Sequence, residues 1–330
     1  MPFAVRLLLP RIALAAVTLL SVSIVIFWAV ELLPGDAATR ILGQGATPQN
    51  TAVLRERLHL DQPPLTRYVN WVGGFMTGDW GQSLVAQTPT SVASAGGRQA
   101  RPVAELVLGR TANTLILAGA ALLLYVPASL VLGIGTAIYR HTKTASLAMG
   151  VILATTAIPE FVVGILLLVG FAVMLPWFPP LSAIGQAAST GEYLSMLVLP
   201  AVTLAVAMTG YAVRMMQTSV VEVLESDYVR LATLKGISRR RLILRHVLPN
   251  ALGPALRVTV INVAWLIGGV VLVEVIFNFP GLGRQMIDSI RLLDTPVIEA
   301  IALIMAAVYI FANLAADIAA AFLNPKLRTR

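Results

Sequence analysis

The hydrophobic positions of the chain gather in long apolar stretches separated by shorter polar segments. Six stretches are long enough to cross the roughly 30 Å of hydrocarbon in a bilayer, which takes about 20 helical residues. They cover residues 12–30, 114–138, 146–175, 194–213, 255–277 and 297–322. The pattern predicts an all-α integral membrane protein with about six transmembrane helices.

Composition supports the same class. The chain is 57% hydrophobic and 12% charged, and its mean hydropathy of +0.82 is too high for a soluble globular domain. The absence of cysteine excludes disulfides and thiolate metal sites. A net charge of +8 raises nucleic acid as a partner. The basic residues, however, cluster at the ends of apolar stretches and in one loop, without interleaved aromatic residues, so we expect no nucleic-acid partner.

The distribution of Lys and Arg predicts the orientation. With the amino terminus inside, 15 of the 24 basic residues face the cytoplasm, as the positive-inside rule requires. Seven of the other nine lie in the long segment 34–110, where the rule is weak. We therefore expect both termini to be cytoplasmic. The first stretch exceeds the apolar core of a usual signal peptide, so we interpret it as an anchor helix.

Three regions follow from this topology. Residues 1–33 are predicted to form the amino-terminal anchor helix. Residues 34–110 form an extracytoplasmic region with short helices at about 48–60 and 65–76, because Thr47 and Pro48 are a favoured helix start and Pro63 and Pro64 force a break. Residues 86–101 are small, polar and rich in Gly and Pro, which is typical of an insertion without chemistry. Residues 111–330 form a core of five helices.

The cytoplasmic loop 222–250 predicts a helix, a turn and a second helix. Residues 222–235 contain strong helix formers with acids near the start, and Gly236 occupies the place of a left-handed cap residue. Ser238 is expected to cap a second helix that Pro249 stops. Six basic residues face three acids in this loop. On charge alone, the loop could serve only to fix the topology.

The spacing within this loop resembles a known pattern. Arg230, Leu231 and Ala232, then Gly236, then His246 to Pro249 reproduce the EAA-x3-G-x9-I-x-LP pattern of ABC importer permeases. Arg230 stands for the Glu of that pattern and His246 for the Ile, as is usual in its peptide branch. Other family-like segments follow in order along the chain: 60–68 (LDxP…Y), 78–83 (GDxGxS), 158–161 (IPxF), 274–283 (ExxFxxPGLG), 294–296 (DxP) and 324–328 (DPRxR, with Asn for Asp). The chain resembles permease subunits of the dipeptide/oligopeptide (peptide/nickel) ABC import family over nearly its whole length.

This resemblance implies a type I ABC importer-like fold in a bacterial inner membrane. It implies a non-catalytic subunit that forms half of a translocation pathway for di- or oligopeptides by alternating access. The implied partners are a second homologous permease, two ABC ATPase subunits and an extracytoplasmic substrate-binding protein. The residues implied to couple to the ATPase are Tyr228, Arg230, Leu231, Ala232, Lys235, Gly236, His246, Leu248 and Pro249.

The sequence itself carries no nucleotide site of the P-loop type. Such a loop needs Gly-Lys-Ser/Thr so that the lysine reaches the phosphates. The only three lysines, Lys143, Lys235 and Lys326, follow Thr, Leu and Pro. We expect no cofactor in this chain, with ATP and Mg²⁺ bound by the partner ATPase.

Polar residues inside the apolar stretches are candidates for the translocation pathway, because a charge in hydrocarbon is costly unless it faces a cavity or a partner. Glu160 follows Pro159 near the middle of the third stretch, where the family usually has a small or hydroxyl residue. A packing role is the alternative for Glu160. The other candidates are Asn262, Glu274 and Asn278; Glu274 could line an outer gate or be half-solvated.

Other functional classes can be weighed against the import hypothesis. A proton- or sodium-coupled secondary transporter is the main alternative, although six spans without an evident repeat and with a docking loop argue against it. An intramembrane hydrolase would need a catalytic constellation in the spans, whereas His59, His141 and His246 all lie in loops. A purely structural membrane subunit stays open. The sequence leaves the substrate open among dipeptides, longer peptides, glutathione and nickel complexes.

Overall fold

The computed structural model describes residues 3–32, 38–39, 47–57, 61–83 and 101–323. Within these ranges the chain is helical and connected by short turns, with one isolated bridge between Gln82 and Pro102. The residues divide into two compact units. We call the unit built on Leu115–Pro280 the core unit, and the unit built on Leu9–Thr114 and Gly281–Ile310 the anchor unit.

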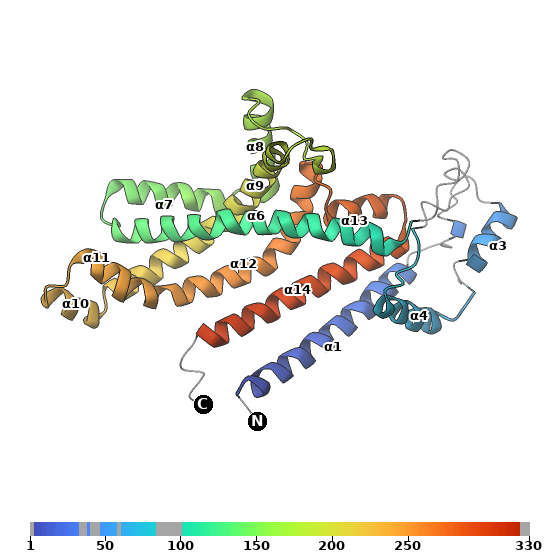
Figure 1. Cartoon of the computed structure of the whole chain (residues 1–330), viewed down its shortest axis with the longest axis horizontal. Coiled ribbons are helices and arrows are strands. Elements are labelled where there is room, and N and C mark those ends of the chain that lie inside the picture. The colour runs from blue at the N-terminus through green and yellow to red at the C-terminus, as the bar shows by residue number, and fades with distance from the viewer. Residues whose placement is uncertain (1–2, 33–37, 40–46, 58–60, 84–100, 324–330) are drawn as a thin grey trace. The chain divides into compact units, whose positions relative to one another are not determined.

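The core unit contains most of α6 (Val103–Ile138), then α7 (Lys143–Thr156), α8 (Glu160–Leu168), α9 (Thr190–Leu224), α10 (Asp227–Leu234), α11 (Arg239–Leu242) and α12 (Leu248–Ile276). A π-helical turn, Val169–Met174, follows α8, and a 3-10 turn covers Ile184–Gln186. Helix α9 packs against α7, α8 and α12 (Figure 1). It therefore lies at the centre of the unit, with many of its side chains buried.

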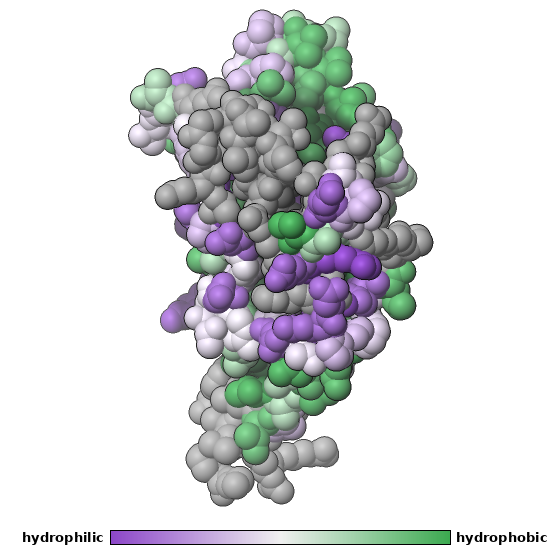
Figure 2. All heavy atoms as spheres, turned by 90° about the vertical axis from the view of Figure 1, so that its right-hand side faces the viewer, coloured by the Kyte–Doolittle hydropathy of each residue, from purple (hydrophilic) through white to green (hydrophobic). Residues whose placement is uncertain are grey.

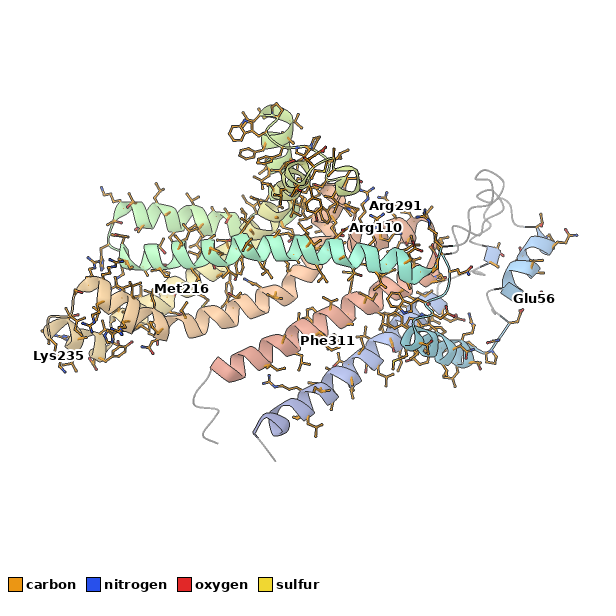
Figure 3. All side chains as sticks on the ribbon, in the orientation of Figure 1. Glu56, Arg110, Met216, Lys235, Arg291 and Phe311 are labelled. Carbon is orange, nitrogen blue, oxygen red and sulfur yellow. The ribbon has the colours of Figure 1, made fainter. Side chains whose placement is uncertain are left out.

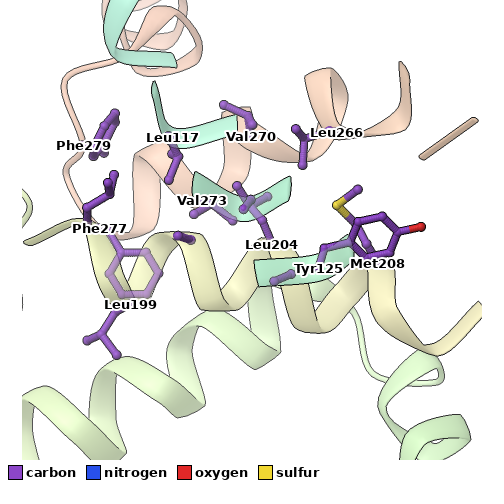
Figure 4. Close-up of a cluster of buried hydrophobic side chains, with 14 of the residues drawn as sticks. Leu117, Tyr125, Leu199, Leu204, Met208, Leu266, Val270, Val273, Phe277 and Phe279 are labelled. Carbon is purple, nitrogen blue, oxygen red and sulfur yellow. The ribbon is translucent and has the colours of Figure 1, made fainter. Parts of the chain in front are cut away.

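The interior of the core unit is a cluster of apolar side chains from α6, α9 and α12 (Figure 4). Its fully buried members include Leu117 and Tyr125 of α6, Leu204 of α9 and Phe277 at the end of α12. The loop before α9 is tied into the same cluster, because the backbone N–H of Ser182 donates to the carbonyl of Phe277 at 2.8 Å. These contacts hold three long helices as one body.

Five of the six predicted apolar stretches coincide with elements that are long and apolar enough to span a membrane: four single helices and one bent pair. Helix α12 covers the remaining stretch except its last residue. Helix α9 is longer than predicted and runs on to Leu224, so the first residues of the loop 222–250 belong to it.

Residues 146–175, predicted as one transmembrane stretch, do not form one continuous helix. This stretch consists of α7 and the segment Glu160–Met174, which are bent by 104° from each other (Figure 1). Pro159 lies at the break, at the N-cap of α8. A proline disfavours helical backbone at the residue before it and removes one helical donor, so the first helix ends and a second begins.

The anchor unit contains most of α1 (Phe3–Glu31), then α3 (Pro48–Arg57), α4 (Pro64–Thr77), the start of α6, α13 (Leu282–Arg291) and the first part of α14 (Thr295–Leu323). Helices α3 and α4 confirm the two short helices predicted in the segment 34–110. Hydrophilic side chains gather at the end where α3 and α4 lie (Figure 2). Residues 58–60, 86–100 and 324–328, on which other predictions rest, are outside the described residues.

Family-like segments far apart in sequence meet inside the anchor unit. The hydroxyl of Ser83 donates to the buried carboxylate of Asp294, and the backbone N–H of Leu282 donates to Thr114 Oγ1 at 2.8 Å. Buried side chains of α6, α13 and α14 pack around these bonds. The predicted division into residues 1–33, 34–110 and 111–330 stays a prediction.

Candidate ATPase-coupling site

Helix α10 is a short helix with a defined stop. It begins after Ser226 and ends at Lys235, where Gly236 adopts a left-handed backbone with a φ of 74°. The N–H of Gly236 donates to the carbonyl of Thr233 at 3.0 Å, and the N–H of Ile237 donates to that of Ala232 at 3.3 Å. This pair of bonds is a Schellman motif, so the left-handed cap predicted at Gly236 is confirmed.

Gly236 is required by its backbone conformation rather than by crowding. A Cβ built at this position would meet nothing within 4 Å. An L-residue in the left-handed region costs roughly 1–2 kcal/mol. A side chain at position 236 would therefore destabilise the turn without a steric clash.

Helix α10 has an inner and an outer face. Val229 is buried, and Ala232 packs beside it against an apolar cluster. On the outer face Tyr228 is 44% exposed, Leu231 56% and Leu234 78%. Arg230 and Lys235 are exposed next to them, and Lys235 lies at the end of α10 (Figure 3). The sequence interpretation placed Ala232 on the docking face; the structure turns it inward and exposes Leu234 instead.

The second half of the loop is not a separate helix that Pro249 stops, so that prediction was wrong. Helix α11 passes into a π turn, Ile243–Val247, and then directly into α12, which Leu248 begins. Pro249 is accommodated because it directly follows the π turn, where the regular hydrogen bonding of the α-helix is already interrupted. Ser238 occupies the expected N-cap position, but its side chain makes no capping hydrogen bond.

A polar contact fastens α10 to the start of α12. The hydroxyl of Tyr228 donates to the backbone carbonyl of His246 at 3.2 Å and accepts from the side-chain amide of Asn250 at 3.1 Å. The same amide donates to the His246 carbonyl at 2.8 Å. Asn250 was missed from the sequence because no spacing rule pairs it with a residue 22 positions earlier.

The loop is packed onto the ends of the long helices. Val229 and Leu242 share a buried cluster with Ala137 at the end of α6, Val220 of α9 and Val247 just before α12. Outside this cluster Arg140 forms an ion pair with Glu225 at 2.9 Å. A force applied to α10 therefore acts on three membrane helices at once.

The predicted pathway residue Asn262 joins two helices. Its side-chain amide donates to the hydroxyl of Tyr125 on α6 at 2.8 Å. Since Tyr125 is fully buried, this bond satisfies a polar group inside the apolar cluster. A structural role accounts for Asn262, and a role in the pathway stays a prediction.

Asn278 and Glu274 lie at the far end of α12. Asn278 has a φ of 54° and ends the helix, because the N–H of Phe279 donates to the carbonyl of Glu274 at 2.8 Å. Asparagine is one of the few residues other than glycine that tolerates this conformation. The side chain of Glu274 is completely buried, not half-solvated. Glu274 is 12 residues, or about 18 Å, from Asn262 along the helix, so the two cannot share one site.

Glu160 lies beside the bend between α7 and α8. Its Oε2 atom is buried, has no hydrogen-bond partner among the described residues, and lies 2.7 Å from where a Cβ of Gly269 would be. Gly269 of α12 thus makes room for the carboxylate. The described residues contain no group of side chains that could hold a metal ion.

Comparison with known proteins identifies the chain. Residues 129–329 match the family described as binding-protein-dependent transport system inner membrane component, and residues 4–118 match the amino-terminal part of such membrane components. The chain belongs to this family. The glutathione transport system permease protein GsiC of Salmonella typhimurium (strain LT2) is 34% identical over 311 residues, 94% of this chain and 95% of the relative. GsiC of Escherichia coli (strain K12) is 33% identical over the same shares.

The chain is therefore an inner-membrane permease subunit of an ABC importer and is not itself catalytic. A binding-protein-dependent permease works with a substrate-binding protein and with an ATPase carried by partner chains. Because the chain belongs to this family, the secondary-transporter and hydrolase alternatives no longer apply.

Proposed function

We propose that this permease forms half of the translocation pathway for small peptides and receives movement from an ATPase subunit through the outer face of α10. A second homologous permease supplies the other half, and two ATPase subunits bind ATP and Mg²⁺. This chain needs no cofactor of its own.

The observation that carries the coupling role is the asymmetry of α10. Its inner face is packed onto the ends of α6, α9 and α12, whereas Leu231 and Leu234 are exposed on its outer face. Burying one such leucine contributes about 1.5–3 kcal/mol, so a partner groove that covers both gains a substantial apolar contact. Arg230 and Lys235 at the edge of this face favour acidic groups at the rim of that groove.

Transmission follows from the way the loop is joined to the membrane helices. Helix α10 follows α9 after a two-residue turn, and α11 passes through the π turn into α12 without a break. When ATPase closure moves α10 as a rigid body, α9 and α12 move with it. Helix α12 carries Gly269, which contacts Glu160 at the bend of α7 and α8. Because of this contact, a movement of α12 changes the surroundings of the Glu160 carboxylate. We therefore assign Glu160 to the translocation pathway.

The proposed substrate class rests on the relatives. Both reported relatives are named as glutathione transport system permeases, and glutathione is itself a small peptide. We infer that this permease passes di- or oligopeptides, with glutathione the first candidate. Selectivity among them belongs largely to the substrate-binding protein.

Reconstitution tests this function. The permease, its partner permease, the ATPase subunits and the binding protein are assembled in proteoliposomes, and ATP hydrolysis is measured with glutathione, a dipeptide, a tetrapeptide or a nickel chelate. We expect a peptide to stimulate hydrolysis and to accumulate in the vesicles, and ionophores that collapse proton and sodium gradients to leave uptake unchanged. Stimulation by the nickel chelate alone would contradict the peptide class. Uptake that depends on an ion gradient would contradict the ATP-driven mechanism.

A further inference from the structure

Helix α4 of the anchor unit has three distinct faces. Tyr68, Trp71 and Phe75 form an aromatic face, and Leu65, Val69, Val72 and Met76 form an apolar stripe at i, i+4, i+7 and i+11. Thr66, Asn70, Gly73 and Thr77 each follow a stripe residue by one position. They therefore lie about 100° further round the helix. Each of these positions is exposed, and together they form a polar stripe.

The aromatic face fixes α4 to the end of the candidate span Leu9–Glu31. The rings of Tyr68 and Trp71 lie 5.4 and 6.1 Å from that of Phe27 in α1. The hydroxyl of Tyr68 is hydrogen-bonded to that of Ser23 at 2.8 Å, and Arg67 forms an ion pair with Glu31. These contacts place α4 at the level where α1 leaves the hydrocarbon.

The apolar stripe is not covered by the anchor unit. Leu65 is 68% exposed, Val69 60% and Met76 82%. Three large apolar side chains on one line, with a polar stripe beside them, form an amphipathic surface rather than scattered exposed residues. Helix α1 also exposes large apolar side chains at this end of the span, at Val25 and Trp28.

We propose that α4 lies in the membrane interface at the Glu31 end of α1, with the stripe Leu65, Val69 and Met76 in the boundary between lipid headgroups and acyl chains. The occupant of this surface is lipid. Tyr68, Trp71 and Trp80 lie at the depth where aromatic side chains are enriched in membrane proteins. The polar stripe then faces the aqueous side, and the Arg67–Glu31 pair marks the level of the headgroups.

Lipid fits the stripe better than a protein partner does. The docking face of a soluble binding protein mixes apolar and polar groups about as the rest of a protein surface does, whereas this stripe is apolar from Leu65 to Met76. A lipid-facing surface needs no matched pocket, and the exposed apolar face of α1 beside it must already contact acyl chains. The helix would thus act as a second anchor that fixes the depth and rotation of α1.

Site-directed spin labelling tests this placement. The chain has no cysteine, so Val69→Cys and Met76→Cys place a nitroxide on the stripe without a background label. Asn70→Cys and Thr77→Cys are matched controls one residue further on the same helix, and Val17→Cys is a reference deep in α1. The assembled transporter is studied in phosphatidylethanolamine–phosphatidylglycerol vesicles, and relaxation by oxygen is compared with relaxation by a water-soluble nickel complex.

The proposal expects the labels at 69 and 76 to respond more to oxygen than to nickel, with a depth shallower than that at 17. The labels at 70 and 77 should show the reverse preference. If positions 69 and 76 respond to nickel as strongly as 70 and 77 do, the stripe faces water and the proposal is wrong. If neither reagent reaches positions 69 and 76, a protein surface covers them, which equally overturns it. Uptake by each labelled transporter shows that the anchor unit is intact.

Discussion

Replacing Gly236 by valine tests the coupling turn at its most constrained point. The φ of 74° is strained for any L-residue, by roughly 1–2 kcal/mol in general, and β-branched side chains are genuine outliers there. No neighbour lies within 4 Å of the added Cβ, so the whole cost falls on the backbone. Since about 1.4 kcal/mol is a factor of ten, the native turn becomes roughly five- to thirtyfold less favourable, and we expect transport to fail while membrane insertion is retained.

Two further variants separate this effect from a general loss of folding. Gly236→Asn keeps a residue that tolerates the left-handed conformation, so it should retain most of the transport. Gly78→Val introduces the same strain, at a φ of 88° with open space around the Cβ, in the anchor unit. It should leave coupling intact.

The assay is ATP hydrolysis stimulated by the loaded binding protein, measured with uptake in proteoliposomes. Copurification of the ATPase subunits shows whether the complex still assembles. The reasoning would be refuted if Gly236→Val transported at the wild-type rate. It would also be refuted if Gly236→Asn lost as much activity as the valine variant, because backbone strain would then not be the cause.

Three other changes have defined expected outcomes. The effect of Gly269→Ala on the melting temperature of the purified complex should differ between the wild-type and Glu160→Ala backgrounds, because only in the first would the new methyl group overlap the carboxylate of Glu160. Equal effects in both backgrounds would count against the contact. Asn262→Leu should destabilise the complex by about 0.6 kcal/mol, a typical value for hydrogen bonds between membrane helices, and Tyr125→Phe should give a non-additive double mutant if the two side chains act on each other. Glu225→Gln should change the melting temperature little, since its exposed ion pair contributes about 0–1 kcal/mol.

Local rules predicted the parts of the chain whose structure is decided locally. The apolar stretches predicted the long helices correctly, because a segment in lipid must form its backbone hydrogen bonds within itself, as a helix does. Gly236 was predicted as a left-handed cap because glycine adopts this conformation more readily than any other residue, and the Schellman hydrogen bonds confirm it. The same logic could have identified Asn278 as a helix cap rather than a gate candidate, because asparagine also tolerates a positive φ.

The errors arose where neighbouring elements decide the outcome. Pro159 could have kinked one span or separated two helices, and the 104° bend depends on packing against α9. Pro249 was interpreted as a stop, although a preceding π turn allows it to open α12. Predicting which way Ala232 and Leu234 face would have required knowing where the apolar cluster under α10 lies.

Contacts between residues far apart in the sequence could also not be predicted from it. Ser83 and Asp294 are 211 positions apart, and each stands in a short family-like segment without any signal of its partner. Tyr125 and Asn262 are 137 positions apart in two apolar stretches. A single sequence offers no rule that joins such residues, because only the packing of the helices brings them together.

The most direct test of the coupling claim is a photo-crosslinking measurement on the assembled transporter. A photoreactive amino acid replaces Leu234 on the outer face of α10 or, as a control, Leu123, an exposed apolar residue of α6. The account predicts a covalent adduct with the ATPase subunit from position 234, whose yield changes on addition of ATP, and no such adduct from position 123. The absence of an ATPase adduct at position 234 in a transporter that still hydrolyses ATP would contradict the account.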